Sequence, residues 1–323
     1  MVLSTSNSEG LRLGSAFAAF CILFASGPAA AKATFVTFDA GIPTSINSSN
    51  TVAGYTTSDG FVRTADGTVV TFDVAGATST RALGINDAGE ITGLYRDSGE
   101  VAHGFIRAAD GSITTFDVPK AQGTGGAKIN RKGTIVGVYD DDNGSHGFVR
   151  TAAGRLKRFD VPDTNFTSPD CINDKGAITG VYSSSDGHLH GFVRAPDGAI
   201  TTIDVPGALD TSVACINIKG TVVGSYGTDG EHRFIRYADG TITTFDGQDC
   251  NIFSADINDK GVVTGSCQDR QHTGRFLGFV RKPDGTVKQF RVPNGGNSTT
   301  PVGINNAGVI AGSYRGGGFL RFP

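Results

Sequence analysis

The feature that most constrains the fold is a four-part unit that repeats seven times along the chain. Each unit holds, in the same order, an Ile-Asn pair, a Gly-x-Tyr or close relative, a segment like "GFVR" and a segment like "TFDV". The phenylalanine of the third segment recurs every 40 to 45 residues, at Phe61, Phe105, Phe148, Phe192, Phe234, Phe279 and Phe319. A fixed period of this length is typical of repeat architectures in which neighbouring units share one core.

All four segments are predicted to be β-strands. Val, Ile, Thr, Phe and Tyr alternate with small or polar residues over five to seven positions, as in "SITTFDV". The linking stretches "INDAGEI" and "RAADGSI" carry Asn, Asp and Gly, which suit tight hairpin turns. One repeat is therefore predicted to be a four-stranded antiparallel meander, as in a propeller blade.

The two ends of the repeat region predict how the ring closes. The region opens with a lone strand of the fourth type, "TFVTFDA", and ends after a strand of the third type, "GGGFLRFP". The fold class is thus predicted to be all-β, a seven-bladed β-propeller whose N-terminal strand completes the last blade. An open sandwich or a β-solenoid is the alternative, but neither explains a strand borrowed between the termini. The phenylalanines are expected to fill the outer gaps between blades, since the chain has no tryptophan.

The N-terminal segment is predicted to be a signal peptide over residues 1–31. Arg12 precedes the apolar run "LGSAFAAFCILFASG", and "PAAAKA" offers cleavage after Ala31 or Ala33. An N-terminal core helix is the alternative. The run is too short to span a membrane stably, so we expect no membrane span and a secreted or periplasmic protein with one propeller over residues 32–323.

The unit "GINDAGEITGLYRDSGEVAHGFIRAADGSITTFDVPKA" resembles the HAF family of probable extracellular repeats. That family also has "GIN", a turn, "GxVxG", a histidine before an aromatic strand and a final turn. Gly104 and Arg107 stand where the family has Ala and Trp, which indicates a divergent branch. The resemblance implies export and a propeller-like fold, and it implies no catalytic residue.

Charge and motifs exclude several classes of function. The chain has 28 basic and 31 acidic residues and no basic run, so neither nucleic acid nor an acidic membrane surface is an expected partner. No cofactor is expected, because zinc-type spacing, a phosphate-cradling loop and a nucleophile elbow are all missing. The stretch "DDDNG" at 140–144 is similar to part of a calcium loop but lacks the later Glu, so no metal site is assigned.

Four histidines occupy one repeat position and are predicted to be structural. His103, His146, His190 and His232 directly precede the third strand, and each is expected to bond the Asp of the "FD" pair on the next strand. The arginines that end the third strand also repeat and are predicted to run along the blade surfaces. They are Arg63, Arg107, Arg150, Arg194, Arg236, Arg281 and Arg321.

Residues that break the repeat are better candidates for function. The loops after "GxY" and after "FDVP" should share one face of the ring, and they vary in length and charge. The ligand-binding residues predicted there are Arg96, His188, Glu231, His272, Arg275 and Arg315. Such a set would suit acidic sugars, with Arg neutralising a uronate and His moving a proton if the site is catalytic.

The cysteines of the repeat region are predicted to form disulfides. Cys250 and Cys267 fall on paired strands of one blade, and Cys171 and Cys215 share the position before Ile-Asn in consecutive blades. Free thiols are the alternative.

The function predicted from the sequence is that of an exported, monomeric binding module for an extracellular carbohydrate or protein. A polysaccharide lyase or hydrolase on the variable-loop face is one alternative, and a structural envelope protein is another. No catalytic residue is assigned.

Overall fold

The computed structural model describes residues 33–227, 232–246, 250–252, 256–272 and 274–323, without the side chains of 250–252. Residues Ala33–Pro323 form one compact unit, and the predicted signal peptide lies outside the described residues. Every regular element in the described residues is a β-strand. The same residues contain no helix long and apolar enough to cross a membrane.

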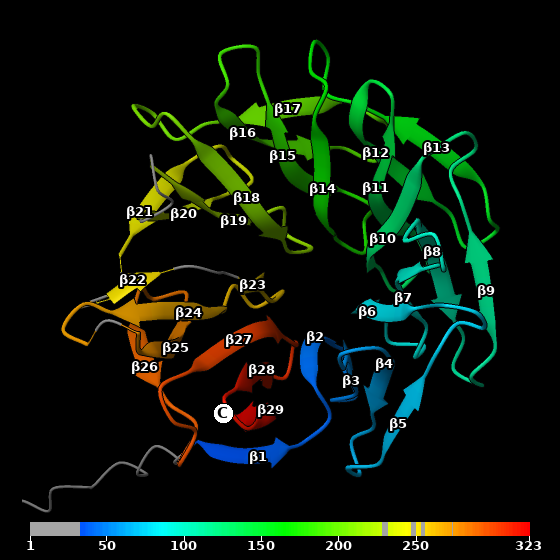
Figure 1. Cartoon of the computed structure of the whole chain (residues 1–323). Helices are drawn as coiled ribbons and strands as arrows, with labels where there is room; N and C mark the ends of the chain where they lie inside the picture. The colour runs from blue at the N-terminus through cyan, green and yellow to red at the C-terminus, as the bar shows by residue number, and fades with distance from the viewer. Residues whose placement is uncertain (1–32, 228–231, 247–249, 253–255, 273) are drawn as a thin grey trace, which may run out of the picture. The chain divides into compact units, whose positions relative to one another are not determined.

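The strands form seven antiparallel sheets, which we call blades I to VII (Figure 1). Blade I is β2 (Ile42–Ile46), β3 (Val52–Tyr55), β4 (Gly60–Arg63) and β5 (Val69–Phe72). Blade II is β6 (Ser79–Ile85), β7 (Ile91–Arg96), β8 (Ala102–Arg107) and β9 (Ile113–Phe116). Blade III is β10 (Gly123–Ile129), β11 (Ile135–Asp141), β12 (Gly144–Arg150) and β13 (Leu156–Phe159). Blade IV is β14 (Thr167–Ile172), β15 (Ile178–Ser183), β16 (Leu189–Arg194) and β17 (Ile200–Ile203).

The remaining blades follow the same order. Blade V is β18 (Thr211–Ile216), β19 (Val222–Tyr226), β20 (His232–Arg236) and β21 (Ile242–Phe245). Blade VI is β22 (Cys250–Ile252), β23 (Asp256–Ile257), β24 (Val263–Asp269), β25 (Phe276–Arg281) and β26 (Val287–Phe290). Here β22 and β23 both pair with β24 and share the place of the first strand. Blade VII is β27 (Thr299–Ile304), β28 (Ile310–Tyr314), β29 (Gly317–Phe322) and β1 (Thr34–Phe38).

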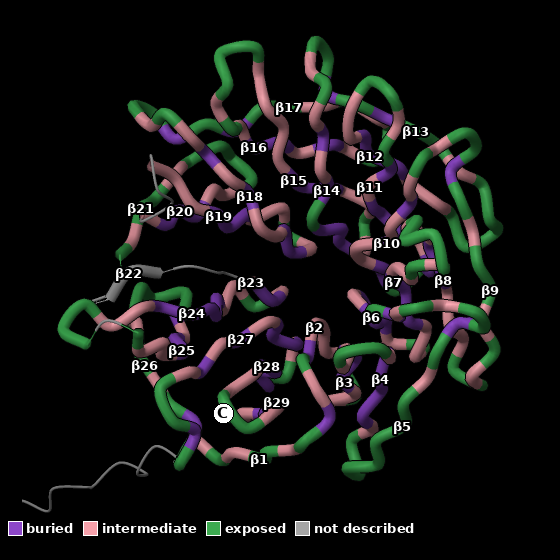
Figure 2. The backbone as a smooth tube through the Cα atoms, in the orientation of Figure 1, coloured by how far each residue is buried: buried purple, intermediate pink, exposed green. Residues whose placement is uncertain are grey.

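The ring closes through the two ends of the repeat region, as predicted. Strand β1 pairs antiparallel with β29, from Thr34 opposite Phe322 to Phe38 opposite Gly318. The first strands of neighbouring blades contact one another around the ring, and β27 of blade VII contacts β2 of blade I. These first strands line the centre, whereas the fourth strands form the rim and are largely exposed (Figures 1 and 2). The predicted seven-bladed propeller is confirmed.

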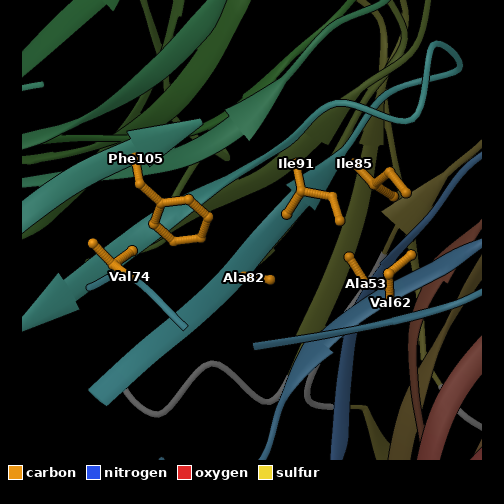
Figure 3. Close-up of a cluster of buried hydrophobic side chains, with 7 residues drawn as sticks. All are labelled: Ala53, Val62, Val74, Ala82, Ile85, Ile91 and Phe105. Atoms are coloured by element: carbon orange, nitrogen blue, oxygen red, sulfur yellow. The ribbon is translucent and has the colours of Figure 1, made fainter. Parts of the chain in front are cut away.

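The core lies in the seams between blades. At the seam of blades I and II, Phe105, Ile91 and Val74 pack with Ala53 and Val62 (Figure 3). The seven third-strand phenylalanines are completely buried. Six of them lie edge-to-face or tilted against a phenylalanine of a fourth strand, as Phe105 does with Phe72 of blade I at a centroid distance of 6.0 Å. The phenylalanines therefore fill the seams, as predicted.

The second-strand glycines allow a close main-chain contact within the blade. The first strands bulge opposite them, as between Ala82 and Gly84 in β6. A Cβ on Gly93 would lie 1.9 Å from the main-chain oxygen of Arg81 in the same blade. The glycine therefore accommodates the bulge within its own sheet.

Candidate functional site

The predicted ligand-binding residues that the structure describes belong to loops or strand ends of four different blades. Arg96 ends β7 of blade II, and its Nη1 donates to the main-chain oxygen of Glu100 at 2.5 Å. His188 precedes β16 of blade IV and lies 3.3 Å from Asp210. Arg96 is therefore held within its own loop, and His188 is held by the loop that precedes blade V.

Among the members of the predicted set that the structure describes, only His272 and Arg275 lie together. In blade VI, Nδ1 of His272 lies 3.1 Å and Nη1 of Arg275 3.4 Å from the same oxygen of Asp269. Arg315 follows β28 of blade VII and lies beside Gly296. Glu231 lies outside the described residues. The described part of the set is thus spread over blades II, IV, VI and VII.

The repeated histidines are bonded as predicted. The distances from Nδ1 to the carboxylate are 3.0, 2.9, 2.8 and 3.0 Å in the pairs His103–Asp117, His146–Asp160, His190–Asp204 and His232–Asp246. Each imidazole also stacks on the tyrosine of the second strand, at centroid distances of 5.0 to 5.2 Å. The prediction that these histidines tie two strands together is confirmed.

Two of these histidines make stability depend on pH. Partial burial opposes the charge of His103 and His146, but hydrogen bonds to two carboxylates each outweigh it and raise both pKa values from 6.5. A raised pKa makes the protonated imidazole stabilising below pH 6.5, and this contribution is lost as the pH rises through the folded-state pKa. Backbone hydrogen bonds lower the pKa of Asp97 and Asp141, so stability also falls in strong acid.

We therefore expect the free energy of unfolding to be higher near about pH 5.5 than near about pH 8, by on the order of 1 kcal/mol. Urea unfolding at both values measures it. In the His103→Gln/His146→Gln variant the difference should shrink. An equally large difference in that variant would assign the effect to other groups.

The third-strand arginines do more than run along the blade surfaces. In six of the seven, all but Arg236, the guanidinium carbon lies 4.8 to 5.0 Å from the ring centroid of a fourth-strand phenylalanine in the neighbouring blade. Arg63 and Arg194 are only 5% exposed. These arginines bridge the seams and are already engaged with the fold.

Blade III breaks the repeat where its third strand turns into its fourth. The turn carries Asp in five other blades, at Asp66, Asp110, Asp197, Asp239 and Asp284, but Ala153 in blade III. The next positions in blade II hold Ser112, Thr114 and Thr115, and in blade III they hold Arg155, Lys157 and Arg158. One anion is thus lost and three cations are gained.

The turn of blade III closes without the aspartate. In the other turns the Asp carboxylate accepts a main-chain N–H two residues on, as Asp110 does from Ser112 at 2.9 Å. In blade III the N–H of Arg155 donates instead to Oγ1 of Thr151 at 3.1 Å. Local turn chemistry therefore does not require a cation at position 155.

The altered turn forms one wall of a groove between blades III and IV, with a volume of about 450 Å³. The residues that line it are Val149, Thr151, Arg155, Leu156, Lys157, Arg194 and Pro196. Arg158 lies outside this lining, where it donates to the main-chain oxygen of Pro119 and its guanidinium lies over Tyr139. The groove combines an apolar wall with two exposed cations, Arg155 and Lys157.

The two exposed cations of the groove are available to a ligand. Within the part of the chain that the structure describes, no carboxylate lies within ion-pair distance of Arg155 or Lys157. A guanidinium can grip a carboxylate or sulfate through two parallel hydrogen bonds, and an ammonium adds a compact charge. The groove can therefore bind an anionic group without first breaking an ion pair.

The asparagines of the Ile-Asn pairs form a closed ring around the channel mouth, which the sequence analysis missed. The side-chain amide of each Asn donates to the main-chain oxygen of the Asn in the next blade, at 2.9 to 3.3 Å. The members are Asn47, Asn86, Asn130, Asn173, Asn217, Asn258 and Asn305. All are nearly buried, so the ring is a structural element.

This asparagine ring surrounds a funnel of about 210 Å³ that opens on the face of the tight turns. Its rim is polar and carries Asp87, Arg131, Asp174 and Asp259. Arg131 bonds Asp87 at 2.9 Å. The funnel is lined by all seven blades and is a second candidate binding site.

The predicted disulfide between Cys171 and Cys215 is present and joins the first strands of blades IV and V, with the Cα atoms 5.1 Å apart. Both cysteines line the funnel. The predicted pair Cys250–Cys267 depends on the side chain of Cys250, which lies outside the described residues.

The carboxylates of the "DDDNG" stretch point to different partners. Asp140 accepts from Oγ of Ser145 at 2.6 Å, and Asp141 lies 3.1 Å from His146. Asp142 accepts from the side chain of Gln122. Among the described residues, no group of three His, Cys, Asp or Glu side chains is placed to hold a metal ion.

Comparison with known proteins shows the fold only. No protein-family model and no curated protein matches the sequence. A streptogramin B lyase structure is similar, with a TM-score of 0.63, 13% identity and coverage of 90% of this chain and 97% of that chain. A catalytically inactive virginiamycin B lyase from Staphylococcus aureus with quinupristin gives a TM-score of 0.62, 12% identity and coverages of 90% and 99%. A puromycin hydrolase gives 0.56 and 12%, over 85% of this chain and 50% of that chain.

Proposed function

We propose that the protein is an exported binding module for an acidic extracellular carbohydrate, held in the groove between blades III and IV. The observation that supports this best is the change of charge in blade III. Arg155 stands where other blades hold Ser, Thr or Ala, and Ala153 stands where they hold Asp. Lys157 stands where three blades hold Thr and blade I holds Val70, and only blade VI has a lysine at this position, Lys288. A change that the turn itself does not need is best explained by a ligand.

The groove suits a sugar that carries a carboxylate or sulfate. Val149 and Pro196 offer apolar surface to the C–H face of a sugar ring, while Arg155 and Lys157 face its anionic group. Hydrogen bonds to charged groups are worth about 1.5 to 3 kcal/mol each. Two such contacts give a modest affinity for one unit, and repetition along a polymer raises it.

Export is supported by the disulfide and by the predicted signal peptide. Bonds such as Cys171–Cys215 persist in oxidising compartments and are rare in the cytosol. A protein that meets extracellular polysaccharides must also leave the cell.

Titration calorimetry with heparin-derived and polygalacturonate oligosaccharides tests the proposal. The variant Arg155→Ser/Lys157→Thr gives blade III residues that other blades use, so it should fold normally and bind at least about tenfold more weakly. Ala153→Asp restores the anion and should also weaken binding. Lys288→Thr removes a fourth-strand lysine of blade VI and serves as the matched control, with affinity unchanged.

The same experiment separates the alternatives. Equal affinity of Arg155→Ser/Lys157→Thr and the wild-type protein, or no binding of either oligosaccharide, would contradict the proposal. After the titration, the oligosaccharide mixed with the protein should still be intact. Shortened or unsaturated products would favour the polysaccharide lyase or hydrolase.

A further inference from the structure

One position of the first strand carries very different chemistry from blade to blade. It lies opposite the residue that precedes the second-strand glycine, just before the Ile-Asn pair. Its occupants are Ser45, Gly84, Lys128, Cys171, Cys215, Asp256 and Gly303. Equivalent positions in a ring need equivalent residues for the fold alone, so this diversity indicates a role for the channel interior.

Lys128 of blade III reaches across the first strands of two other blades. Its Nζ lies 3.5 Å from the main-chain oxygen of Thr44 and 3.4 Å from that of Leu83. A Cβ on Gly84 would lie 3.1 Å from Cα of Lys128, so glycine at the equivalent position of blade II gives the Lys128 backbone room. These long contacts leave the ammonium able to bind a further acceptor.

A glycine of a neighbouring blade, Gly303, likewise leaves room for Asp256 of blade VI. The Oδ2 of Asp256 accepts the N–H of Ile304 at 2.9 Å, and a Cβ on Gly303 would lie 3.5 Å from that oxygen. Burial raises the pKa of Asp256, and the Ile304 hydrogen bond and the charge of Lys128 act against this rise.

Asp170 is the third charged group in this part of the molecule. It lies at the bulge of β14, directly before Cys171. Its side chain is open to water although protein surrounds it, and in the described part of the chain it has no hydrogen-bond or ion-pair partner. Burial raises its pKa to about 7, and the charge of Lys128 acts in the opposite direction.

The charge of Lys128 acts on the pKa of Asp170 and on that of Asp256, but no two of these groups form an ion pair among the described residues. Asp256 lines the funnel, and Lys128 and Asp170 directly precede Ile129 and Cys171, which also line it. A volume of about 210 Å³ suits a molecule of on the order of ten heavy atoms and excludes a polymer.

We propose that the channel binds a small zwitterion, whose carboxylate meets Lys128 and whose cationic nitrogen meets Asp170, with Asp256 adding negative charge on the cationic side. A ligand with both charges satisfies both ends, whereas an ion with one charge leaves the other end unpaired. The disulfide Cys171–Cys215 fixes the wall beside Asp170. This site is separate from the groove between blades III and IV and does not depend on it.

Titration calorimetry with glycine, taurine and glycine betaine tests the channel site, with acetate and methylamine as singly charged comparisons. We expect at least one of the zwitterions to bind about tenfold or more tightly than either singly charged ion. Tight binding of glycine betaine would show that the site recognises the cationic nitrogen without an N–H donor. Preference for glycine over glycine betaine would show that the site needs an N–H donor on that nitrogen.

Lys128→Met and Asp170→Asn should each weaken zwitterion binding by about tenfold or more. Asp170→Asn removes a charge without a partner, so its fold should be preserved even if Lys128→Met folds poorly. Lys132→Met, on an exposed turn of the same blade, is the control. Equal binding by Asp170→Asn and the wild-type protein, or no zwitterion binding at all, would overturn the proposal. Arg155→Ser/Lys157→Thr should bind the zwitterion normally, so failure of one site leaves the other testable.

Discussion

Replacing Asn173 by Ala is expected to lower the free energy of unfolding by about 3 to 6 kcal/mol. The side chain makes three hydrogen bonds in a nearly buried place. Its amide donates to Asn217 O at 2.9 Å, and its Oδ1 accepts the N–H groups of Lys175 and Ala177, both at 3.0 Å. Removal opens the asparagine ring and leaves main-chain groups without partners, which costs about 1 to 3 kcal/mol for each.

Urea unfolding followed by circular dichroism measures this loss. Asn173→Asp keeps an oxygen for the turn but loses the donor to blade V, so we expect a smaller loss than for Ala. Asn143→Ala, on an exposed turn of blade III, is the control and should change stability by less than about 0.5 kcal/mol. A loss for Asn173→Ala as small as that of the control would show that the ring contributes little.

The second large effect is expected from the disulfide. The bond Cys171–Cys215 closes a loop with a sequence separation of 44 residues. Restriction of the unfolded chain by a loop of this length stabilises the folded state by about 4 kcal/mol in the chain-entropy description. The Cys171→Ser/Cys215→Ser variant should therefore unfold at clearly lower urea concentration.

Two measurements check the account of the disulfide. Peptide mapping of the oxidised protein should find Cys171 linked to Cys215, and urea unfolding should show the difference in stability. Free thiols at both positions in the oxidised protein would contradict the assignment. An unchanged urea midpoint for the double variant would show that the bond does not restrict the unfolded chain.

The sequence was sufficient to predict the ring because its evidence is local and repeated. Alternating residues, Gly-containing turns and the fourth-type strand at the start together require seven closed blades. The His103–Asp117 pair also followed from strand register alone. These inferences need only neighbouring strands, and the structure confirms them.

Other features depend on contacts between blades, which one repeat cannot reveal. The Ile-Asn pair predicts only a strand followed by a tight turn, because the bond from its Asn to the next blade exists only once the ring is closed. Lys128 and Asp256 lie three blades apart, so nothing local relates them. Arg96, His188 and His272 lie on separate blades, and their role in ligand binding stays a prediction.

The groove between blades III and IV did leave a signal in the sequence. Ala153 interrupts a turn that is otherwise marked by Asp, and Arg155 and Lys157 follow it. The predicted binding residues came from the variable loops and did not include this turn. Tight turns that depart from their own repeat are equally informative.

Hydrogen–deuterium exchange with and without a heparin-derived oligosaccharide tests most directly where the ligand binds. The central claim is that the protein binds acidic carbohydrate where blade III departs from the repeat. We predict slower exchange in peptides that cover residues 149–158 and 193–198, and little change elsewhere. Slower exchange confined to the variable loops, such as residues 184–188 and 269–272, would contradict the claim.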